Sequence, residues 1–168
     1  MNKKGRIFLL DDDELIISTL SRMLQNEGYE THLLNSSEDA NKIIVDWQPN
    51  LLLLDIDLGE GPSGLDLLEM LQDEEVDFPI VMLTADDSAE SAIRAMRNGA
   101  ADYLTKPFNV DEVKIVLEKL LATSKLKDEV RYLKGSTTAS LQRLFIGESK
   151  PIQKILENAR KMADAGVR

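Results

Sequence analysis

The sequence contains no cysteine and a single histidine, His32, among its 168 residues. The absence of cysteine excludes disulfide bonds, thiol catalysis and thiolate metal sites, and it fits a reducing compartment. One histidine argues against a histidine-based metal site and against a histidine phosphocarrier. No apolar run is long enough to span a membrane, and the polar first six residues do not resemble a secretory signal. We therefore expect a cytoplasmic protein without a membrane partner.

Basic residues are also scarce relative to acidic ones. The chain has 20 lysines and arginines against 30 aspartates and glutamates, a formal net charge of −10. This acidic excess argues against direct binding of nucleic acid. Hydrophobic residues make up 43% of the chain, which is enough for a proper core, and the length suits about one domain plus an appendage.

The stretch from residue 51 to residue 57 is the strongest local signal in the chain. Its four consecutive leucines, 51–54, are typical of a strand buried on both faces in the middle of a parallel sheet. Asp55 follows directly, and open parallel sheets bind ligands beyond the carboxyl ends of their strands. A lone aspartate in this place more commonly just begins a loop. Asp55 is not an isolated case, however, because other predicted strands also end on polar residues.

Short apolar runs alternate along the chain with helical patterns. The runs predict strands at 7–10, 29–34, 51–54, 79–84 and 102–105. Apolar residues at helical spacing predict helices from 15 to near 28, from 36–38 to 47, from 65 to 71, from 88 to 99, and from 109 or 111 to 121. Five such units predict an α/β fold, a doubly wound five-stranded parallel sheet with helices on both faces.

The ends of four predicted strands carry polar or charged side chains that could bind a ligand or react. Asp11 and Asp12 follow the first strand, Asp55 the third, Thr84 the fourth and Lys106 the fifth. These ends converge at one edge of a parallel sheet. Two carboxylates at ~4 Å repel by roughly 4 kcal/mol at an effective dielectric of about 20, so the cluster needs a cation or a proton. Mg²⁺, a hard ion that prefers oxygen ligands, fits best.

A carboxylate beside Mg²⁺, a lysine and a hydroxyl is suited to phosphoryl transfer. We predict that Asp55 is the nucleophile and forms an aspartyl phosphate, while Mg²⁺, Thr84 and Lys106 hold the phosphoryl oxygens. The four consecutive acids at 11–14 exceed what a helix cap requires, although a solvated charged turn would have the same composition.

Residues 6–123 resemble the receiver domain of two-component response regulators. The acidic pair after the first strand, Asp55, Thr84 and Lys106-Pro107 match that family in order and spacing, and the segment 99–108 is especially similar. The resemblance implies a flavodoxin-like receiver fold with Asp55 as phosphoacceptor and a sensor histidine kinase as partner. Such a domain phosphorylates and dephosphorylates itself but is not a conventional enzyme.

The resemblance also implies a set of metal ligands and a pair of switch residues. Asp12 would bind Mg²⁺ directly and Asp11 would assist. Thr84 and Tyr103 would form the switch pair, and Asp13, at the third acidic position, would cap a helix. The full set of implied metal-site residues is Asp11, Asp12, Asp55 and the backbone of Asp57.

The loop after Asp55 departs from the family. Receivers usually have proline four residues and glycine eight residues after the phosphoacceptor. Here those positions hold Gly59 and Ser63, and the glycine comes one residue late, at Gly64. We expect a longer, more flexible loop with unchanged chemistry.

A helical pattern continues beyond the receiver. We expect a helical linker over 124–144, with a weak heptad-like seam through Leu126, Val130 and Leu133 that favours a marginal homodimer. A flexible break is predicted at 135–140.

The last segment, 145–168, resembles the opening of the AAA+ ATPase domain of sigma-54-dependent, nitrogen-regulator-type activators. No Walker A sequence, G-x-x-x-x-G-K-[ST], occurs in the chain. RNA polymerase with sigma-54 and DNA are therefore expected partners only of domains absent from this chain.

Two alternatives compete with a phosphorylated receiver. An apolar strand that ends in Asp55 and Asp57 also resembles a haloacid-dehalogenase-type phosphatase, which would turn over a phosphoester many times. Three features argue against that: Asp55 is on the third strand, the acidic pair comes before it, and the loop after Asp57 lacks the hydroxyl residue that such phosphatases usually place there. The other alternative, a degenerate receiver acting as a dimerisation module, would neither bind Mg²⁺ nor accept phosphate.

Overall fold

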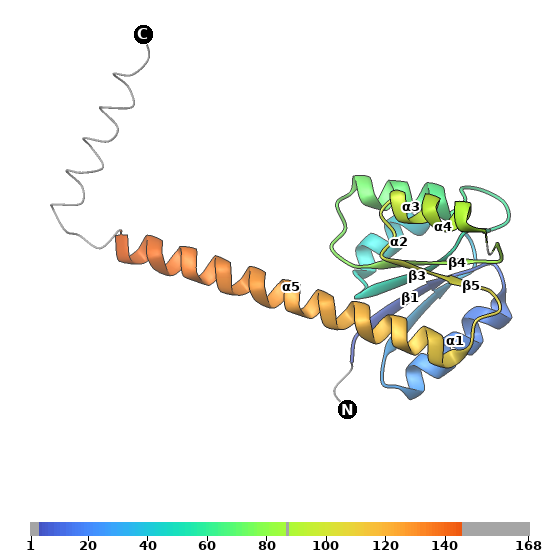
Figure 1. Cartoon of the computed structure of the whole chain (residues 1–168), viewed down its shortest axis with the longest axis horizontal. Helices are drawn as coiled ribbons and strands as arrows, with labels where there is room; N and C mark the ends of the chain where they lie inside the picture. Colours follow the sequence, from blue (N-terminus) through green and yellow to red (C-terminus); the bar gives the residue numbers. More distant parts are fainter. Residues whose placement is uncertain (1–3, 87, 146–168) are drawn as a thin grey trace, which may run out of the picture. The chain divides into compact units, whose positions relative to one another are not determined.

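The predicted fold class is confirmed. The computed structural model describes residues 4–86 and 88–145, without the side chains of 89, 128 and 131–145. Five parallel strands form one sheet in the order β2-β1-β3-β4-β5 (Figure 1). The strands are β1 (Arg6–Leu10), β2 (Glu30–Leu34), β3 (Leu51–Asp55), β4 (Ile80–Thr84) and β5 (Asp102–Thr105).

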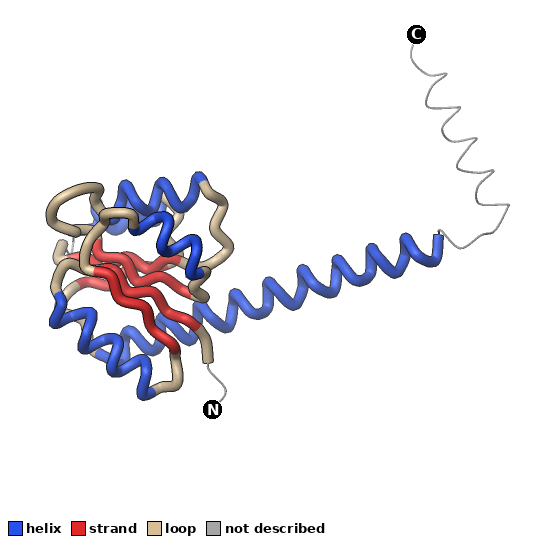
Figure 2. The backbone as a smooth tube through the Cα atoms, turned by 180° about the vertical axis from the view of Figure 1, so that it is seen from behind, coloured by secondary structure: helices blue, strands red, loops and turns tan. Residues whose placement is uncertain are grey.

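Helices cover both faces of the sheet. In Figures 1 and 2, α1 and α5 lie on one face, and α2, α3 and α4 lie on the other. Their bounds are α1 (Glu14–Asn26), α2 (Ala40–Trp47), α3 (Gly64–Asp73), α4 (Ala89–Arg97) and α5 (Val110–Phe145). The sheet is therefore sandwiched between two helical layers, as the alternating sequence pattern predicted.

Two helix starts test the sequence interpretation. Asp13 is the N-cap of α1, and its side chain accepts hydrogen bonds from the backbone N–H groups of Leu15 and Ile16, so the predicted cap is confirmed. Helix α2 begins at Ala40 rather than at the predicted 36–38. The reason is that Asp39, which precedes it, has a left-handed backbone with φ of 55°, which a helix cannot contain.

The leucines of β3 supply the centre of the core. All five residues of β3 are buried. Because successive side chains of a strand point to opposite faces, Leu52 and Leu54 pack in the cluster under α2, α3 and α4, whereas Leu51 and Leu53 pack in the cluster under α1 and α5. A single run of apolar residues thus serves both halves of the core.

The strand register brings the predicted site residues to one edge. Leu10 pairs with Leu54, so Asp11 and Asp55 follow paired residues on neighbouring strands. Thr84, the last residue of β4, pairs with Thr105, the last residue of β5. Lys106 therefore lies one residue past the level at which both strands end. The ends of β1, β3, β4 and β5 therefore meet at the same level.

Helix α5 extends beyond the sheet-containing unit. The chain divides into two units, 1–125 and 126–168, and α5 contributes to both. Its first part buries Val113, Leu117 and Leu121 against the sheet, while Leu126 and Val130 are exposed. The helix runs through 135–140, so the predicted break is wrong. One glycine costs about 1 kcal/mol relative to alanine in a helix, which strong helix formers on either side can offset.

The predicted ATPase-domain fragment, 145–168, lies outside the described residues apart from Phe145 at the end of α5. Among the helices that are described, none is both long enough and apolar enough to cross a membrane.

Candidate functional site: an acidic cleft at the carboxyl edge of the sheet

A cleft of about 640 Å³ opens at the carboxyl edge of the sheet. Asp55 forms part of its wall, and Asp11 lies fully buried beside Asp55. Four other residues that the sequence nominated also line the cleft: Asp12, Asp57, Thr84 and Lys106. The structure therefore gathers the predicted site residues at one place, with the exception of Tyr103.

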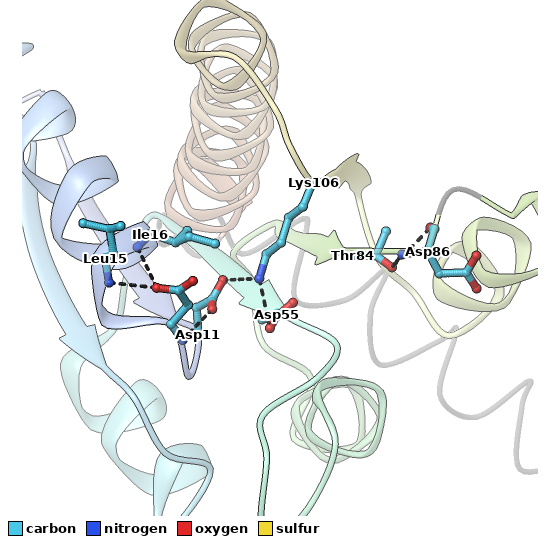
Figure 3. Close-up of polar contacts among 8 residues, drawn as sticks. Asp11, Leu15, Ile16, Asp55, Thr84, Asp86 and Lys106 are labelled. Carbon is cyan, nitrogen blue, oxygen red and sulfur yellow. Dashed lines mark hydrogen bonds and ion pairs between the residues drawn. The ribbon is translucent and has the colours of Figure 1, made fainter.

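Lys106 bridges two buried carboxylates. Its Nζ lies 2.7 Å from Asp11 Oδ2 and 3.1 Å from Asp55 Oδ2. Dashed lines mark both ion pairs in Figure 3. Burial alone would lower the pKa of Lys106. The hydrogen bonds and charges of Asp11 and Asp55 outweigh that effect and raise the pKa above its ordinary value. The lysine is therefore a permanent positive charge at the floor of the cleft.

Asp11, Asp12 and Asp55 have the chemistry of a cation site. Their carboxylates offer oxygens that all lie within 4.8 Å of one another. Burial and the negative charge of Asp11 raise the pKa of Asp55 to about 6, and the charge of Lys106 only partly opposes this. The single positive charge of Lys106 therefore does not neutralise the negative charges of the three carboxylates. A hard divalent cation with oxygen ligands fits this donor set.

The hydroxyl of Thr84 is engaged with the loop that precedes α4. It accepts a hydrogen bond from the backbone N–H of Asp86 at 3.0 Å and donates one to the backbone carbonyl of Asp86 at 3.3 Å (Figure 3). Asp86 is therefore tied to the end of β4 by main-chain contacts. Any movement of the Thr84 hydroxyl towards Asp55 must release this loop.

Gly64 accounts for the unusual loop after Asp55. The backbone N–H of Gly64 donates to the carbonyl of Ile56 at 2.8 Å. A Cβ at Gly64 would lie 1.9 Å from the carbonyl oxygen of Asp55, so no other residue fits there. The late glycine therefore lets the start of α3 touch the end of β3 at Asp55, and Ser63 before it caps α3 together with Asp66.

Tyr103 is the nominated residue that the cleft does not include. It lies on β5 with 40% of its surface exposed. Two apolar side chains of α4 are similarly exposed, Ile93 at 53% and Met96 at 45%. Tyr103 is thus partly exposed and does not line the cleft that contains Asp55.

Two cleft residues on α4 were not predicted from the sequence. Ser91 and Arg94 both line the cleft. Ser91 donates a hydrogen bond to the carboxylate of Asp86. The signal was available, because Ser88, Ser91 and Arg94 recur every three residues and so share one face of a helix that begins beside the site.

Comparison with known families identifies the architecture. The model of the response regulator receiver domain matches residues 7–118. The regulatory protein AtoC of Escherichia coli is 32% identical over 142 residues, which cover 84% of this chain and 31% of AtoC. The nitrogen assimilation regulatory protein NtrX of Azorhizobium caulinodans is 34% identical over 150 residues, which cover 89% of this chain and 32% of NtrX. This chain therefore spans about a third of the length of these relatives.

Solved structures agree with the family match. NtrX from Brucella abortus in complex with ADP superposes with a TM-score of 0.72 at 33% identity, covering 92% of this chain and 34% of NtrX. The signal receiver domain of a LuxO repressor protein from Vibrio parahaemolyticus superposes with a TM-score of 0.71 at 28% identity, covering 75% of this chain and 96% of that domain.

These matches confirm the resemblance to nitrogen-regulator-type proteins, because they include both NtrX and the DNA-binding transcriptional regulator NtrC of Proteus hauseri, which is 32% identical over 119 residues that cover 71% of this chain and 25% of NtrC. With its parallel sheet, its acidic cleft and a family match over residues 7–118, the chain belongs to the response regulator receiver domains of two-component systems.

Proposed function

We propose that this chain is a phosphorylation-dependent switch in which Asp55 accepts a phosphoryl group from a sensor histidine kinase in the cytoplasm. The observation that carries the proposal is the position of Lys106 Nζ, within 3.1 Å of both Asp11 and Asp55. That arrangement supplies a nucleophile, a positive charge and a cation site at one point. The family match to a receiver domain supports the same role.

The proposed reaction is a direct displacement at phosphorus. An ionised oxygen of Asp55 forms a bond to the phosphorus of the phosphohistidine, the P–N bond breaks, and the imidazole leaves with the electron pair. Lys106 neutralises phosphoryl oxygen charge, and the freed Thr84 hydroxyl hydrogen-bonds to one of these oxygens. Mg²⁺, when bound, neutralises charge on the carboxylates and the phosphoryl group. The residues that would hold it are Asp11, Asp12, Asp55 and the backbone of Asp57.

The proposed output begins at Thr84. When its hydroxyl moves to the phosphoryl group, it gives up its contacts with Asp86, and the exposed Tyr103 can turn into the space behind it. This alters the surface formed by α4, β5 and the start of α5. Exposed Leu126 and Val130 on α5 suit a marginal dimer seam, so phosphorylation would change the strength or geometry of a homodimer.

The longer protein would be a transcription activator. The chain covers about a third of AtoC and NtrX, which leaves room for further domains. We propose that 6–123 is the receiver, 124–144 a helical linker and 145–168 the start of a AAA+ ATPase domain. Contacts with sigma-54 RNA polymerase and DNA would belong to the domains that follow.

Mass spectrometry of the intact chain tests the central step. After incubation with Mg²⁺ and a small acyl phosphate, the wild type should gain one phosphoryl group and Asp55→Asn should gain none. Asp57→Asn, a matched change at an exposed aspartate of the same cleft, should still be labelled. Equal labelling of wild type and Asp55→Asn would refute the assignment. Release of many equivalents of phosphate per chain from a phosphoester, in place of the acyl phosphate, would favour the phosphatase alternative.

Thermal unfolding tests the cation site separately. Millimolar Mg²⁺ should raise the melting temperature of the wild type, because a ligand that binds only the folded state stabilises it by mass action. Asp12→Ala should lose both this response and phosphorylation while it remains folded. A melting temperature that does not respond to Mg²⁺ would count against the site and favour a degenerate receiver.

A further inference from the structure

A second positively charged side chain, that of Arg94, lines the cleft beside Asp55. Among the described residues around the cleft, Lys106 and Arg94 are the two with positive charge, and they face five aspartates. Lys106 is already committed to Asp11 and Asp55 by its two ion pairs. Arg94 is exposed on the second turn of α4, so its long side chain has freedom to change partner.

The positive charge of Arg94 acts on an acid of α3, Asp66. Hydrogen bonds from Ser63 lower the pKa of Asp66, and the positive charge of Arg94 lowers it further. Asp66 already accepts hydrogen bonds from the backbone N–H and the hydroxyl of Ser63, at 2.9 and 2.7 Å. Arg94 therefore adds to a carboxylate that is otherwise satisfied, and losing it would not leave Asp66 without partners.

Asp86 is also satisfied by serines. Its carboxylate accepts hydrogen bonds from the backbone N–H of Ser88 at 2.8 Å and from the hydroxyls of Ser88 and Ser91. These bonds lower the pKa of Asp86 and keep its charge within a network of the β4–α4 loop. Neither acid beside α4 therefore depends on the guanidinium.

Phosphorylation changes the charge balance of the cleft in favour of Arg94. Three carboxylates are balanced by Lys106 and one divalent cation. An aspartyl phosphate carries about one negative charge more than the carboxylate that it replaces, as phosphorylated side chains carry −1.5 to about −2 near pH 7. The planar guanidinium matches phosphate oxygens with paired donors, which a lysine cannot do.

We propose that Arg94, which lines the cleft beside Asp55, binds the phosphoryl group on Asp55, so that its charge acts less on Asp66. This inference rests on the proposed function and names a further phosphate-binding residue for the same site. It also gives α4 its own link to the phosphoryl group, independent of Thr84. Asn98, the C-cap of α4, donates to Glu69 of α3 at 2.7 Å, so the carboxyl end of α4 would stay joined to α3.

The test measures the affinity for beryllofluoride, a phosphoryl mimic, in the presence of Mg²⁺ by titration calorimetry. Arg94→Gln should bind about three- to tenfold more weakly than the wild type, which corresponds to about 0.7–1.4 kcal/mol. Arg97→Gln is the matched control, because it removes the same charge from the same helix at a residue that does not line the cleft. It should stay within about twofold of the wild type.

A second set of variants changes Asp66, the acid on which the charge of Arg94 acts in the unphosphorylated protein. Asp66→Asn should bind beryllofluoride more tightly than the wild type, because Arg94 no longer has a competing charge, and an asparagine oxygen can still accept from Ser63. The gain should vanish in the Arg94→Gln background. Arg94→Lys, which keeps the charge without the paired donors, should recover only part of the affinity.

The outcomes separate the two claims. Equal affinities of Arg94→Gln and Arg97→Gln, or a gain from Asp66→Asn that persists without Arg94, would overturn the role of Arg94 while Asp55 phosphorylation stands. No binding by the wild type, together with no labelling of Asp55, would overturn both. Circular dichroism of each variant should match the wild type, because neither Arg94 nor Asp66 is buried.

Discussion

Helices α3 and α4 lie side by side on the same face of the sheet, yet they are held in different ways. Helix α3 buries five of its residues and starts with Gly64 pressed against the carbonyl of Asp55. In α4, Ala95 is buried, whereas Ile93 and Met96 expose about half of their surfaces. One helix is packed by apolar contact, and its neighbour is held mainly by polar contacts.

The difference indicates which helix can transmit a signal. The start of α3 is pressed against the end of β3 at Asp55 and would move only if the core were disrupted. Helix α4 meets the cleft through Ser91, Arg94 and the Thr84–Asp86 loop, whose hydrogen bonds can be exchanged without exposing apolar surface. Elements with few buried apolar contacts open at low free energy. We therefore expect α3 to position Asp55 and α4 to respond to it.

The largest effect should come from breaking the packing of α3. Leu68→Ala removes a fully buried side chain and should lower the free energy of unfolding by about 2–5 kcal/mol. Ile93→Ala on α4, the matched control, removes an exposed side chain and should change it by less than about 0.5 kcal/mol. Urea unfolding of the three proteins checks this. Similar losses in both variants would contradict the comparison.

The ionisation of Asp55 should give the next largest effect, in metal-free buffer. Because the pKa of Asp55 is raised to about 6 in the folded protein, the folded state retains a proton that the unfolded chain loses. The contribution of Asp55 to stability should therefore be greatest below its unfolded pKa, near 4, and should fall as the pH rises through about 6, by up to about 3 kcal/mol.

Asp55→Asn should lack this dependence and should be the more stable protein at neutral pH. Urea unfolding in a chelator between acidic and neutral pH measures the difference, with Asp57→Asn as an exposed control. Parallel stability curves for wild type and Asp55→Asn would show that Asp55 is not strained by burial and by Asp11.

The cap of α4 should have a smaller and local effect. Ser88 accepts the backbone N–H of Ser91 at 3.3 Å, and its loss should cost about 1 kcal/mol. Because α4 has little apolar packing, Ser88→Ala should speed amide hydrogen exchange in α4 and leave exchange in α3 unchanged. An equal increase in both helices would mean that they open as one unit.

The smallest effect concerns the lifetime of the phosphoryl group. Asp57 and Asp86 lie two residues after Asp55 and Thr84, and both line the cleft where water must approach. Asp57→Ala and Asp86→Ala should each change the dephosphorylation rate by less than about tenfold, which is under about 1.4 kcal/mol, without preventing phosphorylation. Decay rates identical to the wild type in both variants would show that neither position controls access of water.

Much of this site could be predicted because the strand ends repeat a simple rule. Apolar runs ended in Asp11, Asp55, Thr84 and Lys106, and parallel register brings such ends together. Contacts between elements distant in sequence could not be predicted in this way. The fit of Gly64 against Asp55 and the approach of Arg94 to the cleft depend on how α3 and α4 are oriented on the sheet. The helix through 135–140 was missed because local glycine and serine content outweighed the helix formers around it.

Amide hydrogen exchange with and without beryllofluoride and Mg²⁺ tests the difference between the two helices most directly. In the wild type, the mimic should change protection in α4 and in the loop at Asp86, while α3 beyond its first turn should stay as it was. Asp55→Asn should show neither change. Equal changes in α3 and α4, or an α4 response that persists in Asp55→Asn, would contradict the account.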